Sequence, residues 1–361
     1  MYISSLSLCN FRNYENAQIE FSPHTNLIYG NNAQGKTNIL EAVYLFATGR
    51  SHRAKSDKEM IRFDCDFAKL AIDFCDSFRE YNSSMHFERS GKKTIKINNV
   101  PIKKLSQLMS YLNVVMFSPE DLSLVKGSPS ARRRFCDSAI SQLHAGYLSH
   151  LIDYNKVLLQ KNSLLKTLRK NNVRSDTTLS IWNEQLAEHG HKIMQYRADF
   201  INALSIFVTA IQEEISGEKL TIEYLPSIRL EEFSKDSFFN YIEERQYREI
   251  EMTSSLYGIQ RDDIAITVNG NDAKSYGSQG QQRTATLAMK IALADYINAQ
   301  KGEYPVLLLD DIMSELDINR RLYLSQKIRD KQVLITGTDT DIVKNTEETK
   351  LFRVDKGTII S

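Results

Sequence analysis

The most specific chemical signal in the sequence is a loop rich in glycine and polar residues, GNNAQGKT, at positions 30–37. It matches the pattern G-x-x-x-x-G-K-[ST], in which backbone N–H groups converge on phosphate oxygens and the following helix adds the positive end of its dipole. In such a loop Lys36 reaches the β- and γ-phosphates of a nucleotide, and the Thr37 hydroxyl is a ligand for Mg²⁺. We therefore predict that ATP is bound by Gly30, Asn31, Asn32, Ala33, Gln34, Gly35, Lys36, Thr37 and Asn38.

A second pattern, PVLLLDDIMSELD, begins at position 305. Its apolar residues 306–309 predict a buried strand that delivers Asp310 to its C-terminal end, where a carboxylate holds Mg²⁺ opposite Thr37. Asp311 follows at once and is placed to orient the attacking water, so we predict Lys36 and Asp311 as the catalytic residues. The two motifs lie near opposite ends of the chain. We nevertheless expect the strands that carry them to be neighbours in one sheet, with a whole lobe inserted between them.

A third pattern, SYGSQGQQR, places Ser278, Gly280 and Gln281 at the start of a predicted helix. Serine at a helix N-terminus either caps the helix or helps to bind an anion. Taken alone, the pattern is that of a helix cap. Taken with the other two motifs, it is the signature of the ABC-type ATPases, which touches the γ-phosphate held by a second copy of the protein. The segment SELD at 314–317 then takes the place of the dimer-crossing loop of that class.

Composition sets limits on the function. The chain has 361 residues, of which 42% are hydrophobic and 25% charged, so it can form two soluble lobes. No run approaches the roughly 18 apolar residues of a membrane span, and the N-terminus does not resemble a secretory signal. Cys9, Cys65, Cys75 and Cys136 form no CxxC pair, which indicates buried reduced thiols and a cytoplasmic protein. The net charge is +1, so nucleic acid would have to bind local basic patches.

The pattern of apolar residues changes from strand-like to helical at about residue 118. Two long apolar stripes, separated by the polar segment KNNVRSDTT, predict an antiparallel pair of helices. This hairpin either packs within a helical lobe or protrudes as an arm that docks a partner. The first stripe contains Tyr147, Leu151, Tyr154, Leu158, Lys161, Leu165 and Leu168, and the second contains Trp182, Leu186, Ile193, Tyr196, Phe200, Leu204, Phe207 and Ile211.

Together these patterns predict an α/β fold, an ABC-type ATPase head whose mixed sheet carries the phosphate-binding loop. A second, mainly helical lobe with the helix hairpin is inserted into it. We place the ATPase lobe at residues 1–117 and 300–361 and the helical, signature-bearing lobe at 118–299.

Several blocks of sequence resemble the RecF family of bacterial recombinational repair proteins, which are ABC-type ATPases related to the SMC proteins. The blocks run LCNFRNYENAQIEFSPHTNLIYGNNAQGKTNILEAVYLFATGRSHR, VVMFSPEDLSLVKGSPSARRRFCD, GSQGQQRTATLAMKIA and LLLDDIMSELD. They are spread over essentially the whole chain. The predicted hairpin is far shorter than the coiled coils of SMC proteins and double-strand-break repair ATPases, which favours RecF over both.

The resemblance implies an ATP- and Mg²⁺-dependent homodimer that clamps double-stranded DNA at single-strand gaps and junctions. With RecO- and RecR-type partners, such a protein helps RecA to replace single-strand binding protein. The family's weak, DNA-stimulated ATPase acts as a switch, which leaves open whether the chain is best described as an enzyme. Asp311 stands where most ABC members carry Glu, and its shorter side chain predicts slow hydrolysis.

The resemblance also implies that basic side chains bind DNA phosphates. Candidates are Arg50, Arg53, Lys55 and the run Arg132, Arg133 and Arg134, with Lys92, Lys93, Lys103 and Lys104 as further positions. For the arginine run, a solvated helix face or an internal ion-pair cluster with Glu120 and Asp121 is an equal alternative. Arg12 is expected near the base or α-phosphate of the nucleotide, or else in a structural salt bridge.

Two other classes of protein share part of this pattern. The ATPase subunit of an ABC transporter carries all three motifs, but transporters place a His where this chain has Gly337 and Thr338. A metabolite kinase would usually place its two nucleotide motifs within about one hundred residues, which the present spacing disfavours.

Overall fold

The chain divides into two compact units in the computed structural model, which describes residues 1–173, 176–340 and 349–360. The first unit joins Met1–Leu122 to Thr286–Ser361, and the second is Ser123–Ala285. The sequence-based boundaries, at 117/118 and 299/300, do not coincide with these. The second boundary differs most because helix α9, Gln279–Lys301, is continuous and the division falls within it.

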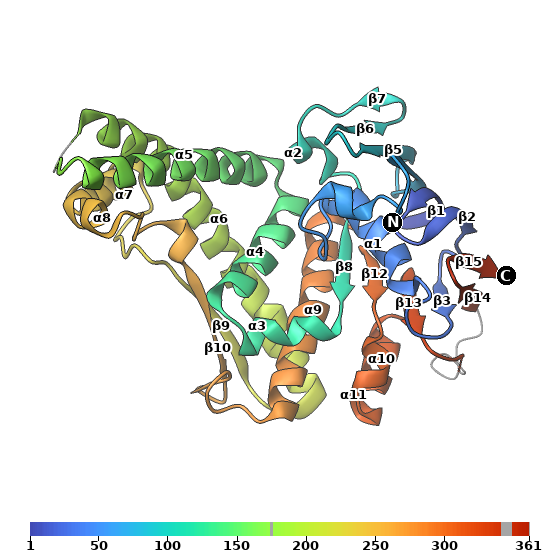
Figure 1. Ribbon diagram of the computed structural model, residues 1–361. Coiled ribbons are helices and arrows are strands. Elements are labelled where there is room, and N and C mark those ends of the chain that lie inside the picture. Colours follow the sequence, from blue (N-terminus) through green and yellow to red (C-terminus); the bar gives the residue numbers. More distant parts are fainter. Residues whose placement is uncertain (174–175, 341–348, 361) are drawn as a thin grey trace. The chain divides into compact units, whose positions relative to one another are not determined.

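The nucleotide motifs lie on a mostly parallel sheet of the first unit, in which the strand order is β15-β14-β3-β13-β12-β8 (Figure 1). Its strands are β3 (Thr25–Tyr29), β8 (Val114–Phe117), β12 (Val306–Leu309), β13 (Val333–Gly337), β14 (Thr349–Asp355) and β15 (Thr358–Ile360). Strands β8 and β12 are continuous apolar runs, VVMF and VLLL, and every residue in them is buried.

The prediction that β3 and β12 are neighbours is wrong. Strand β13 lies between them and pairs in parallel with both. The loop at Gly30 and the carboxylate at Asp310 therefore follow the C-terminal ends of two parallel strands that have β13 between them. This arrangement brings β13 residues into the site.

The second sheet of this unit is antiparallel, with the order β2-β1-β4-β5-β6-β7. Its strands are β1 (Tyr2–Phe11), β2 (Tyr14–Glu20), β4 (Phe67–Cys75), β5 (Glu80–Glu88), β6 (Lys93–Ile97) and β7 (Val100–Pro101). Apolar residues such as Leu6, Leu70 and Met85 alternate with polar ones along these strands. Their side chains pack in a hydrophobic core shared with helix α1 (Lys36–Thr48) and the parallel sheet. Short elements complete the unit: η1 (Asp57–Met60), α2 (Leu105–Leu108), η2 (Pro119–Leu122), α10 (Ile312–Glu315) and α11 (Ile318–Lys327).

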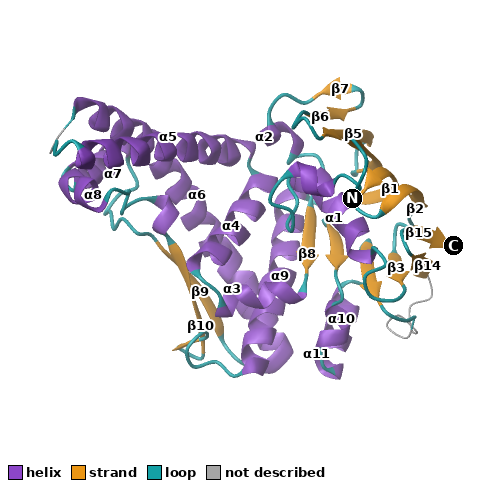
Figure 2. Cartoon of the chain, viewed as in Figure 1, coloured by secondary structure: helices purple, strands orange, loops and turns teal. Residues whose placement is uncertain are grey.

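The second unit is mainly helical, as predicted (Figure 2). It contains α3 (Ser123–Lys126), α4 (Pro129–Leu143), α5 (Ala145–Lys170), α6 (Thr177–Ser216), α7 (Lys235–Glu243), α8 (Gln246–Met252) and η3 (Ile259–Arg261). A small antiparallel sheet is formed by β9 (Leu220–Leu225), β10 (Asp263–Val268) and β11 (Asn271–Asp272). Asn269 and Gly270 both have positive φ, 51° and 81°, and form the expected hairpin turn between β10 and β11.

Helices α5 and α6 are the predicted pair, and they pack along each other. Their predicted connection includes residues 174–175, which lie outside the described residues. Lys161 occupies its expected place on the α5 stripe, fully buried, where its ammonium binds the Glu249 carboxylate of α8 at 2.6 Å. Leu151 and Leu158 are only half-buried. Since α6 also packs on α7 and β9, the hairpin is part of a helical core within its own unit.

Composition led to two expectations, that the cysteine thiols are buried and that no segment spans a membrane. Cys136 is buried, but Cys9, Cys65 and Cys75 are half-buried, so the prediction of buried thiols holds for one of the four. Among the helices in the described part of the chain, none combines the length and apolar character that a membrane span requires.

Candidate nucleotide-binding site

The loop at Gly30 has the backbone that its glycines predict. Gly30 and Gly35 have φ values of 149° and 115°, which favour glycine. A Cβ on Gly30 would lie 2.3 Å from the carbonyl oxygen of Val354, so a larger residue would displace the neighbouring strand. Helix α1 begins directly after the loop. Its residues are all described, and its first turn has neither an acidic residue nor a side-chain cap. Its N-terminal N–H groups are therefore suited to an anion.

Lys36 is folded back over this loop. Its Nζ donates to the carbonyl oxygens of Gly30 at 2.7 Å and Asn31 at 2.9 Å. Burial lowers the pKa of Lys36, and the nearby carboxylates of Asp311 and Asp310 oppose that shift. The ammonium is thus held at the centre of the loop by neutral oxygens that a phosphate oxygen can replace.

Asp310 joins the loop to two strands. Its Oδ1 accepts hydrogen bonds from the hydroxyls of Thr37 and Thr336, each at 2.8 Å. Asp310 is buried, with 9% of its surface exposed. Thr37 and Asp310 therefore meet as predicted and present hard oxygen donors side by side, the ligand type that Mg²⁺ prefers in ATPases. Thr336 was missed by the sequence analysis. The available signal was a hydroxyl at the end of the buried run QVLIT, but its position beside β12 depends on the strand order.

Asp311 lies at the N-terminus of α10 in the left-handed backbone region, with φ of 50°. Asp and Asn tolerate that region better than other residues with side chains, so the backbone itself favours Asp over Glu here. Burial raises the pKa of the Asp311 carboxyl, Lys36 opposes this, and the charge of Asp310 raises it further. The backbone N–H of Asp311 donates to Thr336 Oγ1 at 2.9 Å, which ties the two predicted acidic residues to the same threonine.

Arg12 forms the salt bridge that was one of its two predicted roles. Its guanidinium donates to both carboxylate oxygens of Glu41, at 2.9 and 2.6 Å, and the Glu41 side chain is fully buried. Burial alone raises the pKa of Glu41, but the hydrogen bonds from Arg12 and Ser51 outweigh it and lower the pKa overall. Contact between Arg12 and a nucleotide stays a prediction.

The neighbouring residue, Asn13, was also missed. Its Nδ2 donates to the Gln34 carbonyl at 2.7 Å, and its Oδ1 accepts from the Asn38 side chain at 2.8 Å. Tyr14 adds a hydrogen bond from its hydroxyl to the Gly35 carbonyl, at 3.0 Å. These contacts fix the second half of the phosphate loop. The sequence signal was the polar segment NFRNY, whose distance from the loop in the chain concealed the contact.

Ser278 and Gln281 form a reciprocal cap at the start of α9. The Gln281 N–H donates to Ser278 Oγ at 3.2 Å, and the Ser278 N–H donates to Gln281 Oε1 at 2.8 Å. Gln281 also donates to Glu218 Oε1 at 2.6 Å, and Ser278 is exposed. The helix-cap interpretation of this motif therefore describes the geometry of the isolated chain. Gly280 follows the cap in the first turn, and an anion-binding role for the three residues stays a prediction.

The candidate DNA-binding residues differ in how available they are. Arg50, Arg53 and Lys55 are exposed, with Arg53 donating to Asn38 Oδ1 at 3.2 Å. Lys92, Lys103 and Lys104 are exposed as well, whereas the half-buried Lys93 binds the Gly49 carbonyl at 2.7 Å and the Asp57 carboxylate at 3.3 Å.

The arginine run needs a correction. Arg132 is buried, 6% exposed, and its guanidinium donates to both carboxylate oxygens of Asp263, at 2.6 and 2.9 Å. Arg133 is half-buried and donates to the Asp262 carbonyl at 2.7 Å. Because a buried guanidinium with a bidentate partner cannot also reach a phosphate, Arg132 is removed from the DNA candidates. Arg134 is exposed and remains one.

The alternative prediction, an internal ion-pair cluster of the arginine run with Glu120 and Asp121, was right about an internal ion pair but wrong about the acidic partner. Asp263 binds Arg132, whereas Asp121 binds Lys290 at 2.7 Å and accepts from the Ser118 N–H. The sequence could not identify the partner because Arg132 and Asp263 are distant in the chain.

Comparisons with known proteins agree on one family. Residues 2–360 match the family described as "RecF/RecN/SMC N terminal domain". The chain is 44% identical over 364 residues to the DNA replication and repair protein RecF of Agathobacter rectalis and 41% identical over 373 residues to that of Staphylococcus carnosus, with at least 99% of each chain covered.

Solved structures agree with this result. A recombination mediator protein RecF, described with ATPrS in the RecFOR pathway, superimposes with a TM-score of 0.93 at 35% identity, covering 99% of this chain and 97% of that one. An SMC head bound to the C-terminal winged-helix domain of ScpA matches with a TM-score of 0.57 at 16% identity, covering 99% and 96%, and shows the shared ABC-type ATPase head fold alone. The chain therefore belongs to the RecF family of DNA replication and repair proteins.

Proposed function

We propose that this protein is an ATP-gated DNA clamp of recombinational repair. One observation carries the ATP-binding part: the hydrogen bond between Thr37 and Asp310 assembles a phosphate loop and a strand-end carboxylate into one site. Solved RecF structures that are described as complexes with ATP and ATPrS support the choice of nucleotide. Gly30 to Asn38 would hold its phosphates, with Lys36 exchanging its loop carbonyls for β- and γ-phosphate oxygens.

Thr37 and Asp310 would hold Mg²⁺, the first through its hydroxyl and the second through water. The ion, when bound, neutralises charge on the phosphates. Asp311 would orient the attacking water and accept its proton, a role that requires the ionised carboxylate. Its short side chain and its backbone position favour slow turnover, which suits a switch better than a pump.

We further propose that two copies close on ATP. In that arrangement Ser278, Gly280 and Gln281 of one copy would approach the γ-phosphate held by Lys36 of the other, since an exposed helix N-terminus favours an anion. Hydrolysis would remove this contact and reopen the dimer. Duplex DNA at gaps would be held by Arg50, Arg53, Lys55 and Arg134, with a smaller contribution from Arg133. RecO- and RecR-type proteins would use the closed state to promote RecA loading.

The test is fluorescence anisotropy of a labelled gapped duplex titrated with the protein, once with Mg-ATP and once with Mg-ADP. The proposal expects tighter binding with ATP and a steep loss of affinity as salt rises, because phosphate contacts release counterions. Equal, feeble binding in both nucleotide states would refute the clamp while leaving nucleotide binding itself intact.

A further inference from the structure

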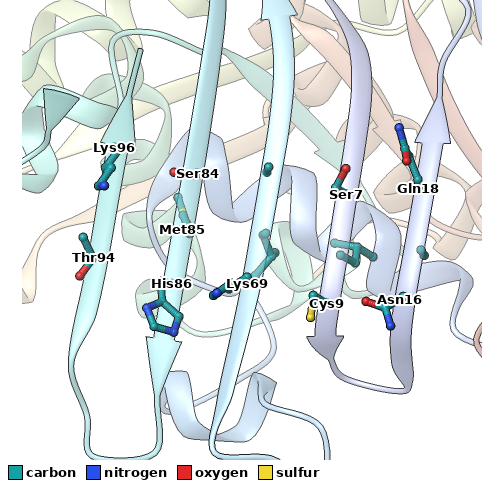
Figure 3. A pocket seen from close by; sticks show the side chains of 14 residues that line it. Ser7, Cys9, Asn16, Gln18, Lys69, Ser84, Met85, His86, Thr94 and Lys96 are labelled. Carbon is teal, nitrogen blue, oxygen red and sulfur yellow. The ribbon is translucent and has the colours of Figure 1, made fainter. Parts of the chain in front are cut away.

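The antiparallel sheet of the first unit carries a groove on the face opposite its core. The groove has a volume of about 690 Å³ and crosses β2, β1, β4, β5 and β6. Figure 3 shows its side chains standing in rows across the strands. The polar or thiol-bearing members are Ser7, Cys9, Asn16, Gln18, Lys69, Ser84, His86, Thr94 and Lys96. None of them belongs to the nucleotide site or to the basic positions considered above.

The polar side chains of this groove are available to a ligand. Within the described part of the chain, those of Ser7, Asn16, Gln18, Ser84, Thr94 and Lys96 make no hydrogen bond or ion pair. Outside the groove, the same face behaves differently. Ser5 donates to Asp73 Oδ2 at 2.6 Å, and Asn82 donates to Asp73 Oδ1 at 2.7 Å. Among the described residues, Ser5 and Asn82 therefore bind Asp73, whereas the six groove side chains named above have no such partner.

The charge of the groove favours an anion. Its 14 lining residues include Lys69, Lys96 and His86 but no Asp or Glu. Of the carboxylates on the adjacent rows, Asp73 accepts the two bonds above, and Glu88 binds Ser90 at 3.0 Å and Lys92 at 4.0 Å. Glu20, opposite Ser5 at the β2 end of one adjacent row, is exposed and lies outside the lining of the groove. A ligand in the groove would therefore meet cations and neutral hydrogen-bonding groups.

The strand register gives the groove its shape. One row runs Gln18, Ser7, Ala71, Ser84 and Lys96, and the next runs Asn16, Cys9, Lys69, His86 and Thr94. Strands lie about 4.8 Å apart and alternate residues about 7 Å, so the floor is about 19 Å long and one row spacing wide. Most of the residues along the middle of this floor are small. A slender chain that crosses the strands can reach both rows, whereas a duplex would rest on the taller side chains.

We infer that this groove binds the sugar–phosphate backbone of single-stranded DNA. The inference rests on the proposed function in that DNA is the ligand, and it adds a separate place for the single strand of a gap. Lys69 and Lys96 would contact phosphates, while Asn16, Gln18 and Thr94 would hydrogen-bond to phosphate and sugar oxygens. Such contacts position a strand without reading its bases. The only aromatic ring among the lining residues is the imidazole of His86, so base stacking contributes little.

The first experiment removes the two lysines together. The variant Lys69→Ala/Lys96→Ala is compared with Lys350→Ala, a matched control: Lys69 lies 5.2 Å from the Phe67 ring on β4, and Lys350 lies 5.6 Å from the Phe352 ring on β14. Both are exposed strand lysines. Anisotropy is measured with a labelled oligo(dT) of about 20 nucleotides and with a blunt duplex of similar length.

The double variant should bind oligo(dT) about tenfold more weakly, and its salt slope should fall by about 1.4, or 0.7 for each lost phosphate contact. Its duplex affinity, and both affinities of Lys350→Ala, should change less than about twofold. Unchanged oligo(dT) binding in the double variant, or equal losses in the control, would overturn the inference. So would binding of a labelled poly-glutamate peptide that the double variant loses, with no binding of oligo(dT), which would assign the groove to an acidic protein segment.

The outcomes also separate this inference from the proposed function. A wild-type protein that binds gapped duplex in an ATP-dependent way but does not bind oligo(dT) overturns only the groove. A wild-type protein that binds neither DNA overturns both.

A second experiment needs no variant. Cys9 lines the floor of the groove, whereas the similarly half-buried Cys65 lies in a loop outside it. Alkylation of each thiol is followed by peptide mass spectrometry with and without oligo(dT). Slower modification of Cys9 alone is expected. An unchanged Cys9 rate at an oligo(dT) concentration that saturates the anisotropy signal would contradict the inference.

Discussion

Thr37 and Asp310 are 273 positions apart in the chain, yet the Thr37 hydroxyl donates to Asp310 Oδ1 at 2.8 Å. The same oxygen accepts the Thr336 hydroxyl at 2.8 Å. One carboxylate oxygen thus holds the start of α1 and the end of β13 against the end of β12. Its charge and its hydrogen-bonding capacity can be tested separately.

Asp310→Asn should keep the fold and lose the metal. The amide oxygen can still accept from both threonines, so stability should change by no more than about 1 kcal/mol. The missing charge should abolish the stabilisation that Mg²⁺ adds to ATP binding. Thermal unfolding with ATP alone and with Mg-ATP measures this, and an undiminished Mg²⁺ effect would contradict the assignment of Asp310.

Lys36→Arg should reduce ATP hydrolysis by about two orders of magnitude or more, a loss comparable to removing an electrostatic transition-state contact. The guanidinium is too large for the place in which the Lys36 ammonium binds the Gly30 and Asn31 carbonyls. Phosphate release under single-turnover conditions is the measurement. Lys331→Arg, at a half-buried lysine near Tyr304, serves as the control and should retain full activity.

Asp311→Asn should reduce hydrolysis by about 100-fold or more while leaving ATP binding intact, since the water would lose its base. The asparagine tolerates the left-handed backbone at this position. The variant should therefore accumulate the ATP-bound dimer. Gel filtration with ATP tests this outcome, and a dimer as short-lived as that of the wild type would argue against Asp311 as the water-orienting group.

The pH dependence of stability gives Asp311 a second signature. Its pKa is raised in the folded chain, chiefly by burial. Between the unfolded pKa, about 3.9, and the higher folded pKa, the native state holds a proton that the unfolded state has lost. Stability therefore falls as pH rises through this window and then stays level. Because asparagine does not titrate, Asp311→Asn should gain melting temperature over wild type from about pH 4 upward and show no gain below it.

Ser278→Arg should bind ATP normally and fail to form the ATP-dependent dimer, because a large cation would fill the helix N-terminus offered to the partner. Losing the cap should cost the free chain about 1 kcal/mol. Ser278→Asn, which can still cap α9, controls for that loss and should match wild-type stability. Analytical ultracentrifugation with Mg-ATP decides. Normal dimerisation of Ser278→Arg would refute the proposed contact between copies.

Arg132 and Arg134 should respond in opposite ways to substitution. Arg132→Ala leaves the Asp263 carboxylate without its bidentate partner and should cost about 3 kcal/mol of unfolding free energy. Arg134→Ala should change stability by less than about 0.5 kcal/mol. If Arg134 contacts a phosphate, its removal should lower the salt slope of duplex binding by about 0.9. Denaturant unfolding and salt titrations of the two variants make the comparison.

The sequence by itself determined the chemistry that depends on neighbouring residues. The phosphate loop needs glycines and a following helix within a few positions, and the run VLLLDD places a carboxylate at a strand end. The Asn269–Gly270 turn and the helix hairpin, with Lys161 on its buried stripe, are likewise set by short-range pattern, because backbone conformation and amphipathic period act over a few residues. The resemblance to RecF rested on the same local blocks.

Only the tertiary structure decided which distant residues meet. The order of strands placed β13 between β3 and β12, so Thr336 joins Thr37 as a second donor to Asp310 Oδ1. It also gave Arg132 the partner Asp263 and brought Asn13 to the phosphate loop. Among the described residues, it left unpaired polar side chains on β1, β2, β5 and β6. Each of these depends on long-range packing and register, and a sequence pattern carries no record of which hydrogen-bond partner a folded side chain will find.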